Sequence, residues 1–346
     1  MNRFQALFSA AAALCSVVLA TAASAQPATE RAMGAAQIGG ASDPGMSFVL
    51  KAKALAGKDY LWTTNLLCAR GEIVSSYFGG NMMQAADQDM QPLKVFDNLY
   101  YVGMRQVGAW VVKTPQGIIL IDSLFPGDGQ SKIEPGLKVL GLRPQDIKLI
   151  ILTHGHVDHY GGARYLQDKY GAHVMMSAAD WDFMEKQRGD PMTKPKRDQM
   201  ITDGQVIDFG GAHITAVLTP GHTPGSIALI IPVTDHGQPH AAALWGGTMI
   251  SAPVPLALRE QYLVSMDHFL TFTHGSKVDV EIENHPYVGN QVVKLFELAQ
   301  RKPGEPHPLV VGSDTVDRYF GVLRTCAEAG IARAKVGLER TGGGPE

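Results

Sequence analysis

The sequence predicts an α/β fold arranged as two similar αβ halves that share one core. Short β-branched or aromatic runs alternate with segments of helical periodicity from Phe96 onward. Turns that contain Gly or Pro separate these runs, as Pro115-Gln116-Gly117 does. With 346 residues, 45% of them hydrophobic, the chain can bury a substantial core.

Each half is expected to alternate strands with helices. In the first half the predicted strands are Leu99–Val102, Val107–Thr114, Ile118–Asp122, Ile147–Thr153 and His173–Ser177, and the helices are Ile133–Leu140, Gly161–Tyr170 and Asp180–Gln187. Asp180 is the expected N-cap of the last helix. In the second half the strands are Val206–Phe209, Ile214–Leu218, Ile227–Ile231, Ala241–Trp245 and Val278–Ile282, and the helices are Gln261–Thr273, Gln291–Arg301 and Thr315–Ala329.

The N-terminus predicts export. Arg3 is followed by an apolar run over 6–20 and by small residues at Ala23 and Ala25, the pattern of a secretory signal cleaved after Ala25. A membrane anchor is the alternative, but the run is shorter than the roughly 20 residues of a spanning helix and no stop-transfer charges follow. We therefore expect a periplasmic or secreted protein without a stable membrane anchor. The expected organisation is a signal peptide (1–25), an N-terminal extension (26–93), the main domain (94–332) and a C-terminal tail (333–346).

The net charge limits the kinds of molecule that the protein is expected to bind, and the cysteine content bears on a possible disulfide. The formal net charge of −3 provides no basic field for a polyanion. We therefore expect a small-molecule substrate and no binding of nucleic acid.

Cleavage after Ala25 would remove Cys15 and leave Cys68 and Cys326. These two residues form either a disulfide or two buried free thiols, since the sequence does not give their separation.

The segment from Thr153 to Gly162 is dense in metal ligands. His154 and His156 are two residues apart at a strand end, so both side chains face the same side of an extended chain. Asp158 and His159 follow where the chain turns toward the next helix. Imidazole and carboxylate are good zinc ligands, and this pattern predicts a metal site more readily than a set of turn residues.

Two later histidines complete the candidate site. His222 lies between two Pro-Gly turns directly after the strand Ile214–Leu218. His285 follows the strand-like run Val278–Ile282, and His268 and His274 compete with it as ligand. His285 is favoured because it follows a strand end, whereas the other two lie in or at the end of a predicted helix.

The HxHxDH and TPGHTPG segments make the chain resemble the metallo-β-lactamase superfamily over roughly residues 94–332. The resemblance implies an αββα sandwich with a dinuclear zinc site at one edge of its sheets. It also implies that His154, His156 and His222 hold one zinc. A second zinc would be held by Asp158, His159 and His285.

The stretch from Trp245 to Ser251 indicates the branch of that superfamily. Thioester hydrolases of the glyoxalase II type and quorum-quenching lactonases use a carboxylate that bridges both metals, whereas this stretch contains no Asp or Glu. The chain is therefore most similar to the third dizinc subclass of class B β-lactamases. The segment from His307 to Gly312 also resembles that subclass, and the first subclass would need a Cys ligand where Thr248 stands.

This resemblance implies a mechanism. Zinc lowers the pKa of a bound water to about 7, so an exported dizinc hydrolase could open a β-lactam or similar cyclic amide by attack of zinc-bound hydroxide, with a role in antibiotic resistance. Asp158 would bind the second zinc and orient the hydroxide. Thr248 and Ser251 are candidate contacts for the substrate carboxylate. Asp122, at a strand end, either fixes an imidazole ligand or caps its strand.

Other classes fit less well. The chain has no GxSxG elbow, P-loop, GxGxxG fingerprint or HExxH helix. Two alternatives stay open on the same site. One is a hydrolase of another ester, lactone or amide, and the other is a non-hydrolytic metal or redox protein, since imidazole-rich sites bind several transition metals.

Overall fold

The computed structural model describes residues 43–69, 89–250 and 254–339. The predicted signal peptide and Ser251 lie outside these residues. Within the described ranges, no helix combines the length and the apolar character needed to span a bilayer.

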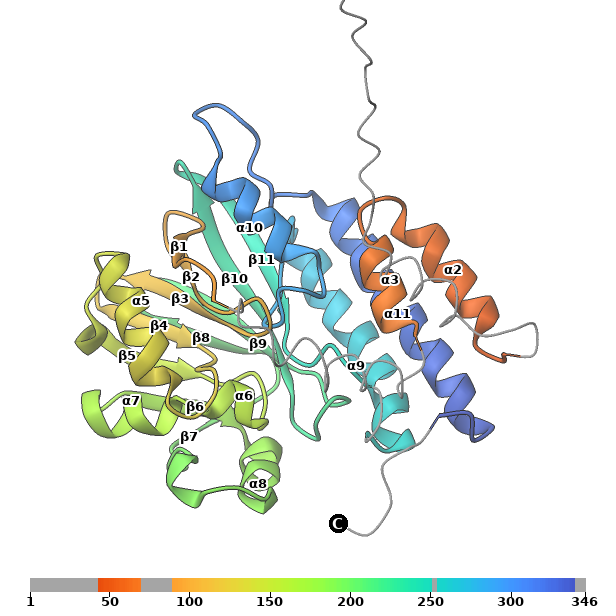
Figure 1. Ribbon diagram of the computed structural model, residues 1–346, viewed down its shortest axis with the longest axis horizontal. Helices are drawn as coiled ribbons and strands as arrows, with labels where there is room; N and C mark the ends of the chain where they lie inside the picture. The colour runs from red at the N-terminus through yellow and green to blue at the C-terminus, as the bar shows by residue number, and fades with distance from the viewer. Residues whose placement is uncertain (1–42, 70–88, 251–253, 340–346) are drawn as a thin grey trace, which may run out of the picture. The chain divides into compact units, whose positions relative to one another are not determined.

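In the described part of the chain, one sheet has seven strands in the order β1-β2-β3-β4-β5-β6-β7 (Figure 1). They are β1 (Leu93–Lys94), β2 (Leu99–Gly103), β3 (Gly108–Thr114), β4 (Gly117–Ile121), β5 (Ile147–Ile151), β6 (His173–Ser177) and β7 (Gln199–Ile201). Neighbours from β1 to β4 are antiparallel, and neighbours from β4 to β7 are parallel. The carboxyl ends of β4 and β5 therefore lie side by side, and the segments that begin at Asp122 and Leu152 leave the sheet together.

A second sheet has five strands, again within the described residues, in the order β12-β11-β10-β9-β8. They are β8 (Gln205–Phe209), β9 (Ala212–Leu218), β10 (Ile227–Asp235), β11 (Gln238–Trp245) and β12 (Val280–Ile282). β11 and β12 are parallel, and the other pairs are antiparallel. The β10–β11 hairpin closes at His236 and Gly237, whose φ values of 49° and 78° suit a tight two-residue turn.

Helices cover the outer faces of both sheets (Figure 1). The first sheet carries α5 (Glu134–Val139), α6 (Val157–Tyr160), α7 (Ala163–Tyr170) and α8 (Ala178–Lys186). The second carries α2 (Met46–Ala56), α3 (Leu61–Leu67), α9 (Leu256–Gly275) and α11 (Ser313–Lys335), while α10 (Gln291–Ala299) packs Leu295 into the layer between the sheets. That layer also holds Trp110, Ile151 and Leu229, all fully buried. The predicted αββα sandwich is confirmed.

Two local predictions are wrong for identifiable reasons. Helix α8 begins earlier than expected, because Ser177 is its N-cap and accepts a hydrogen bond from the Asp180 amide. The Asp180 side chain is thereby free to bond elsewhere. Strand β10 continues past Ile231 to Asp235, since Pro232 occupies an exposed position of the hairpin strand without ending it.

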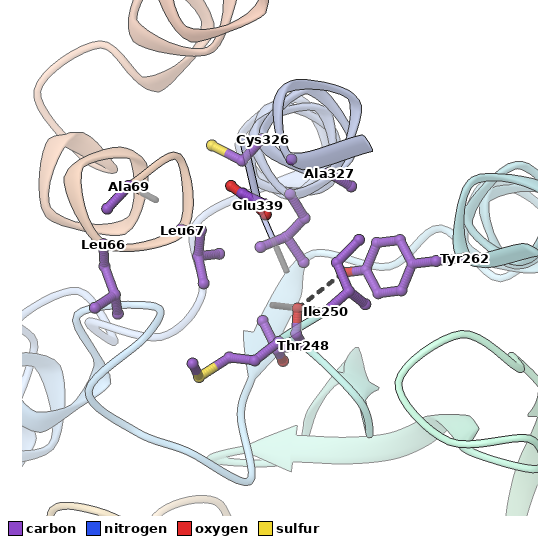
Figure 2. Close-up of a pocket in the computed structure, with 12 residues that line it drawn as sticks. Leu66, Leu67, Ala69, Thr248, Ile250, Tyr262, Cys326, Ala327 and Glu339 are labelled. Carbon is purple, nitrogen blue, oxygen red and sulfur yellow. Dashed lines mark hydrogen bonds between the residues drawn. The ribbon is translucent and has the colours of Figure 1, made fainter. Parts of the chain in front are cut away.

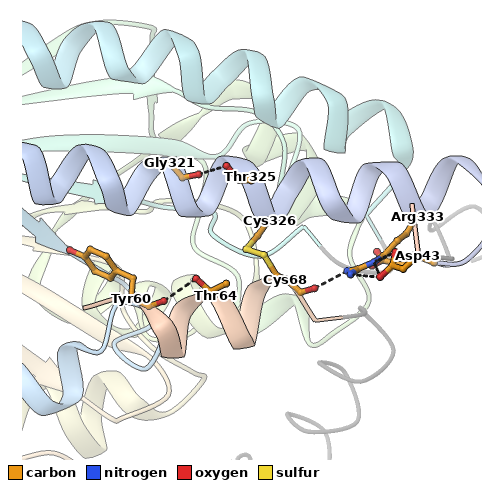
Figure 3. The surroundings of a disulfide bond; sticks show 9 residues. Asp43, Tyr60, Thr64, Cys68, Gly321, Thr325, Cys326 and Arg333 are labelled. Atoms are coloured by element: carbon orange, nitrogen blue, oxygen red, sulfur yellow. Dashed lines mark hydrogen bonds and ion pairs between the residues drawn. A yellow bond between two sulfur atoms is a disulfide. The ribbon is translucent and has the colours of Figure 1, made fainter. Parts of the chain in front are cut away.

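The described parts of both terminal segments pack into the main core. Val49, Ala52 and Ala56 of α2 are fully buried in a cluster with side chains of α11. Cys68 and Cys326 form a disulfide, which decides between the two alternatives left open by the sequence (Figure 3). Helix α11 continues past the predicted boundary at residue 332, and Arg333 is fully buried in an ion pair with Asp43.

Candidate metal centre

The predicted metal ligands lie where strands of both sheets end. Asp122 directly follows β4 and the segment from His154 to His159 follows β5 in the first sheet. His222 follows β9 and His285 follows β12 in the second sheet. Among the described residues, the ligand atoms form two groups, each within 4.8 Å: His154, His156 and His222, and Asp158, His159 and His285.

In the first group three imidazole nitrogens face one another. His222 Nε2 lies 3.2 Å from His154 Nε2 and 2.9 Å from His156 Nδ1. Three neutral imidazoles with converging lone pairs would repel one another, whereas a cation between them would turn that repulsion into coordination. The donor set therefore fits a metal ion.

The second group combines one carboxylate with two imidazoles. Asp158 Oδ2 lies 3.4 Å from His159 Nε2 and 3.8 Å from His285 Nε2, and the two Nε2 atoms are 3.2 Å apart. The rings of His154 and His159 have centroids 4.0 Å apart, so the groups adjoin. Two metals in these groups could share one substrate.

The outer ring nitrogens of four histidines have acceptors. The Nδ1 atom of His159 donates to Asp122 Oδ2 (2.8 Å) and that of His285 to the Gln106 carbonyl (2.8 Å). The Nδ1 atom of His222 donates to the Met249 carbonyl. When these rings are neutral, the bonds place the proton on Nδ1 and leave the Nε2 lone pair directed into the group, as metal ligation requires.

The fourth acceptor is Thr153. Its hydroxyl donates to Asp122 Oδ2 (2.8 Å), so its lone pair is available to His154 Nδ1 at 3.2 Å. Thus Asp122, directly or through Thr153, orients one histidine of each group.

Asp122 is fully buried and accepts several hydrogen bonds. Its Oδ1 accepts from the Thr153 amide (2.8 Å), and Asn284 Nδ2 lies 3.4 Å from Oδ2. The backbone φ of Asp122 is 59°, a left-handed conformation uncommon outside glycine and kept where the surroundings fix it. Of the two roles considered for Asp122, these contacts favour the orientation of an imidazole over a strand cap.

Asp180 joins the two loops that carry the first group. It lies on α8, fully buried. Its Oδ2 accepts from the Gly155 amide (2.7 Å) and the Thr223 hydroxyl (2.7 Å), while Oδ1 accepts from the Gly225 amide (2.6 Å). Burial raises the pKa of this carboxyl to about 6, although the three donors lower it. The loop from His154 to His156 and the loop with His222 are therefore fixed to one carboxylate.

The electrostatics favour neutral imidazoles in the first group. Burial lowers the pKa of His154 and His222 well below the ordinary 6.5, and neighbouring imidazoles lower both further. Burial also lowers the pKa of His156 to about 4. Burial opposes ionisation of Asp158, but the adjacent His159 and His285 hold its pKa below the usual range. Neutral imidazole and ionised carboxylate are the forms that bind metal.

The other histidines weighed against His285 lie elsewhere. His268 pairs with Asp203 at 2.9 Å and His274 with Asp317 at 3.0 Å, and both are on exposed parts of α9. The structure thus brings together the six residues predicted as ligands and leaves these two outside.

The predicted substrate contact at Thr248 has a different environment. Thr248 is 4% exposed, and its hydroxyl donates to Glu283 Oε2 at 2.9 Å. The segment 248–250 lines an apolar pocket together with Leu66 of α3 and Leu323 of α11, and Tyr262 donates to the Thr248 carbonyl (Figure 2). Contact between Thr248 and the substrate stays a prediction. The hydrogen bond to Glu283 does not favour it, because the hydroxyl proton is already donated to that carboxylate.

Several residues of the centre were not identified from the sequence. Thr153, Asn284 and Asp180 are fully buried and bond to the loops that carry the histidines. Thr153 and Asn284 each directly precede a candidate ligand in the sequence, and this position could have identified them. Asp180 has no such position, because it contacts these loops only through tertiary packing.

Comparison with known proteins agrees with this geometry. A family model described as "Metallo-beta-lactamase superfamily" matches residues 102–235. The hydroxyacylglutathione hydrolase of Acidiphilium cryptum is 31% identical over 143 residues, which cover 41% of this chain and 49%, about half, of that protein. The probable polyketide biosynthesis zinc-dependent hydrolase BaeB of Bacillus velezensis is 35% identical over 91 residues, 26% of this chain and 36% of that protein.

One solved structure matches a larger share of this chain than these two relatives do. The crystal structure of BJP-1, a subclass B3 metallo-β-lactamase of Bradyrhizobium japonicum, superposes with a TM-score of 0.64 at 25% identity. The match covers 74% of this chain and 99% of that chain. The similarity therefore includes both halves of the sandwich.

Proposed function

We propose that this chain, which matches the metallo-β-lactamase superfamily model over residues 102–235, is a zinc-dependent hydrolase that opens the ring of a β-lactam or a similar cyclic amide. The observation that carries this proposal is the second ligand group. Asp158, His159 and His285 provide a complete donor set without any carboxylate from the 245–250 stretch.

The packing at Gly247 supports the same branch. A Cβ atom there would lie 2.6 Å from His222 Cβ, and one at Gly246 would lie 2.2 Å from the Ile227 carbonyl oxygen. A side chain at either position would displace a ligand loop or a strand. Neither glycine therefore has room for the bridging carboxylate that this stretch supplies in thioester hydrolases and lactonases.

We propose that two zinc ions occupy the two groups, one held by His154, His156 and His222 and the other by Asp158, His159 and His285. When bound, zinc would polarise a substrate carbonyl and make water a nucleophile at neutral pH.

The chain's own residues prepare this reaction. Asp122, Gln106 and Met249 hold imidazole protons on outer ring nitrogens, so that the inner nitrogens remain donors. Asp158 is the catalytic residue of this proposal, because its carboxylate is partly exposed and can accept a hydrogen bond from the attacking water and orient it.

A second candidate is hydrolysis of a thioester or another ester, lactone or amide on the same site. The similarity to the hydroxyacylglutathione hydrolase of Acidiphilium cryptum favours it. The absence of a carboxylate from residues 245–250 argues against a thioesterase of that type.

Turnover by the full chain, loaded with zinc, tests the proposal. Nitrocefin, a carbapenem and a hydroxyacylglutathione thioester are offered to the wild type, to Asp158→Ala and to the control Asp168→Ala. Asp168 is an exposed residue of α7, paired with Arg164 and Lys196. We expect β-lactam turnover that EDTA and Asp158→Ala abolish and Asp168→Ala leaves intact. Thioester turnover alone would refute the β-lactam proposal and establish the second candidate.

We also propose that the protein is exported after cleavage behind Ala25. The disulfide between Cys68 and Cys326 supports this, because disulfides persist in oxidising compartments. N-terminal sequencing of the mature protein from the periplasm and the medium should begin at Gln26. A mature protein that retains residues 1–25 in the cytoplasm would refute export.

A further inference from the structure

Helix α3, from the N-terminal segment without a predicted role, contacts the turn that carries His285. Trp62 Nε1 donates a 2.6 Å hydrogen bond to the Tyr287 carbonyl. Thr63 Oγ1 donates a 2.6 Å hydrogen bond to the Val288 carbonyl. Both bonds join residues 225 positions apart in the sequence, so tertiary packing alone creates them.

The turn that receives these bonds begins at His285. The Val288 amide donates to the His285 carbonyl at 2.9 Å, and the rings of His285 and Tyr287 have centroids 5.6 Å apart. Val288 is fully buried and clusters with Leu66 of α3. A shift of this turn would therefore shift the His285 ring relative to Asp158.

Helix α3 is itself fixed to the main core. Cys68, directly after the helix, is bonded to Cys326 of α11 (Figure 3). The Cys68 carbonyl accepts a 2.7 Å hydrogen bond from the buried Arg333, whose guanidinium also pairs with Asp43 at 2.7 Å. The helix is thus a rigid support for the 285–288 turn.

The first ligand group has other supports. His154 bonds to Thr153, His222 bonds to the Met249 carbonyl, and Asp180 holds both loops from α8. The hydrogen bonds of Trp62 and Thr63 reach only the turn after His285 in this centre, as far as the described residues extend. Loss of these bonds should therefore affect the second group selectively.

We propose that Trp62 and Thr63 are positioning residues that hold His285 in the second metal group. This gives the N-terminal segment a role in metal binding, and it rests on the proposed two-metal function. Outer partners that orient metal ligands typically contribute 10–100-fold to metal affinity.

Zinc titration of the metal-free full chain tests this inference. In the double variant Trp62→Phe, Thr63→Val, we expect the first equivalent of zinc to bind as in the wild type and the second to bind at least about 10-fold more weakly. Cobalt(II) titration provides a spectroscopic readout, since the absorption that grows with the second equivalent should weaken.

Matched variants separate positioning from general damage. Thr64→Val removes the neighbouring buried hydroxyl, whose hydrogen bond in the described part of the chain goes to the Tyr60 carbonyl one turn earlier, at 3.0 Å. This variant should bind both equivalents normally. Thr63→Ser keeps the donor, and the single variant should bind both equivalents as the wild type does. Equal affinities in the double variant and the wild type would overturn the inference, as would equal weakening of both equivalents.

The same titration distinguishes this inference from the proposed function. A wild-type chain that binds only one equivalent would contradict the two-zinc proposal and the inference together. A wild type that binds two, with no selective loss in the double variant, would leave the proposed function standing and reject the positioning role.

Discussion

Replacement of Asp180 by Asn tests whether one buried carboxylate joins the loops of the first metal group. Asn keeps a single acceptor oxygen. The Asn amide keeps more hydrogen bonds when its oxygen takes the place of Oδ2, because that oxygen then still accepts from Gly155 and Thr223. The new NH₂ group then faces the Gly225 amide, whose acceptor is lost.

The size of the effect follows from this geometry. A buried amide left without an acceptor costs about 1–3 kcal/mol. Gly225 cannot move easily to find another partner, because a Cβ atom on it would already lie 2.1 Å from Ser177 Oγ. We therefore expect Asp180→Asn to lower the free energy of unfolding by about 1–3 kcal/mol at neutral pH and to weaken zinc binding by the first group.

Urea unfolding of the metal-free chain measures this loss as a lower midpoint at unchanged slope. The matched control is Asp182→Asn, on the same helix, where an exposed carboxylate pairs with Arg197. We expect little change there, since exposed ion pairs contribute little. The reasoning would be refuted by an Asp180→Asn midpoint equal to that of the wild type, or by equal losses in both variants.

Three further predictions address other parts of the structure. Asp122→Asn weakens the acceptor of His159 Nδ1, and zinc titration should show a loss of about 10–100-fold in metal affinity, whereas unchanged affinity would exclude this role. Arg333→Met removes the buried guanidinium that pairs with Asp43 and should cost about 3–5 kcal/mol in urea unfolding, with partial recovery when Asp43→Asn is added. Burial lowers the pKa of His307, so the folded chain holds it neutral while the unfolded chain takes up a proton near pH 6.5. Its contribution to stability is therefore present above that pH and is lost as the pH falls toward the lower folded pKa. His307→Asn should reduce the slope of stability against pH below 6.5, and an unchanged slope would contradict the assignment.

The convergence of the candidate ligands could be predicted because most of them follow strand ends, whereas their division into two groups was implied by the family resemblance. His154 and His156 share a side of an extended chain, and His222 and His285 each follow a strand of the other sheet, so the packing of the two sheets brings them to a common edge. His268 and His274 were given lower weight from the sequence, and α9 places them beside Asp203 and Asp317, away from the two groups.

The supports of the ligands could not be predicted in the same way. In the sequence Asp180 looks like an ordinary N-cap, whereas Ser177 is the N-cap in the structure. Tertiary packing brings the Asp180 carboxylate to Gly155 and Gly225. The disulfide of Cys68 spans 258 residues, and no local pattern encodes such a separation. For the same reason, the role of α3 beneath the 285–288 turn is visible only in three dimensions.

The most direct test of the two-metal centre is the position of bound zinc. Anomalous diffraction at the zinc edge, on crystals of the full chain grown with zinc, should give two peaks. One should lie among His154 Nε2, His156 Nδ1 and His222 Nε2, and the other among the side chains of Asp158, His159 and His285. A single peak, or peaks away from these two groups, would contradict the account.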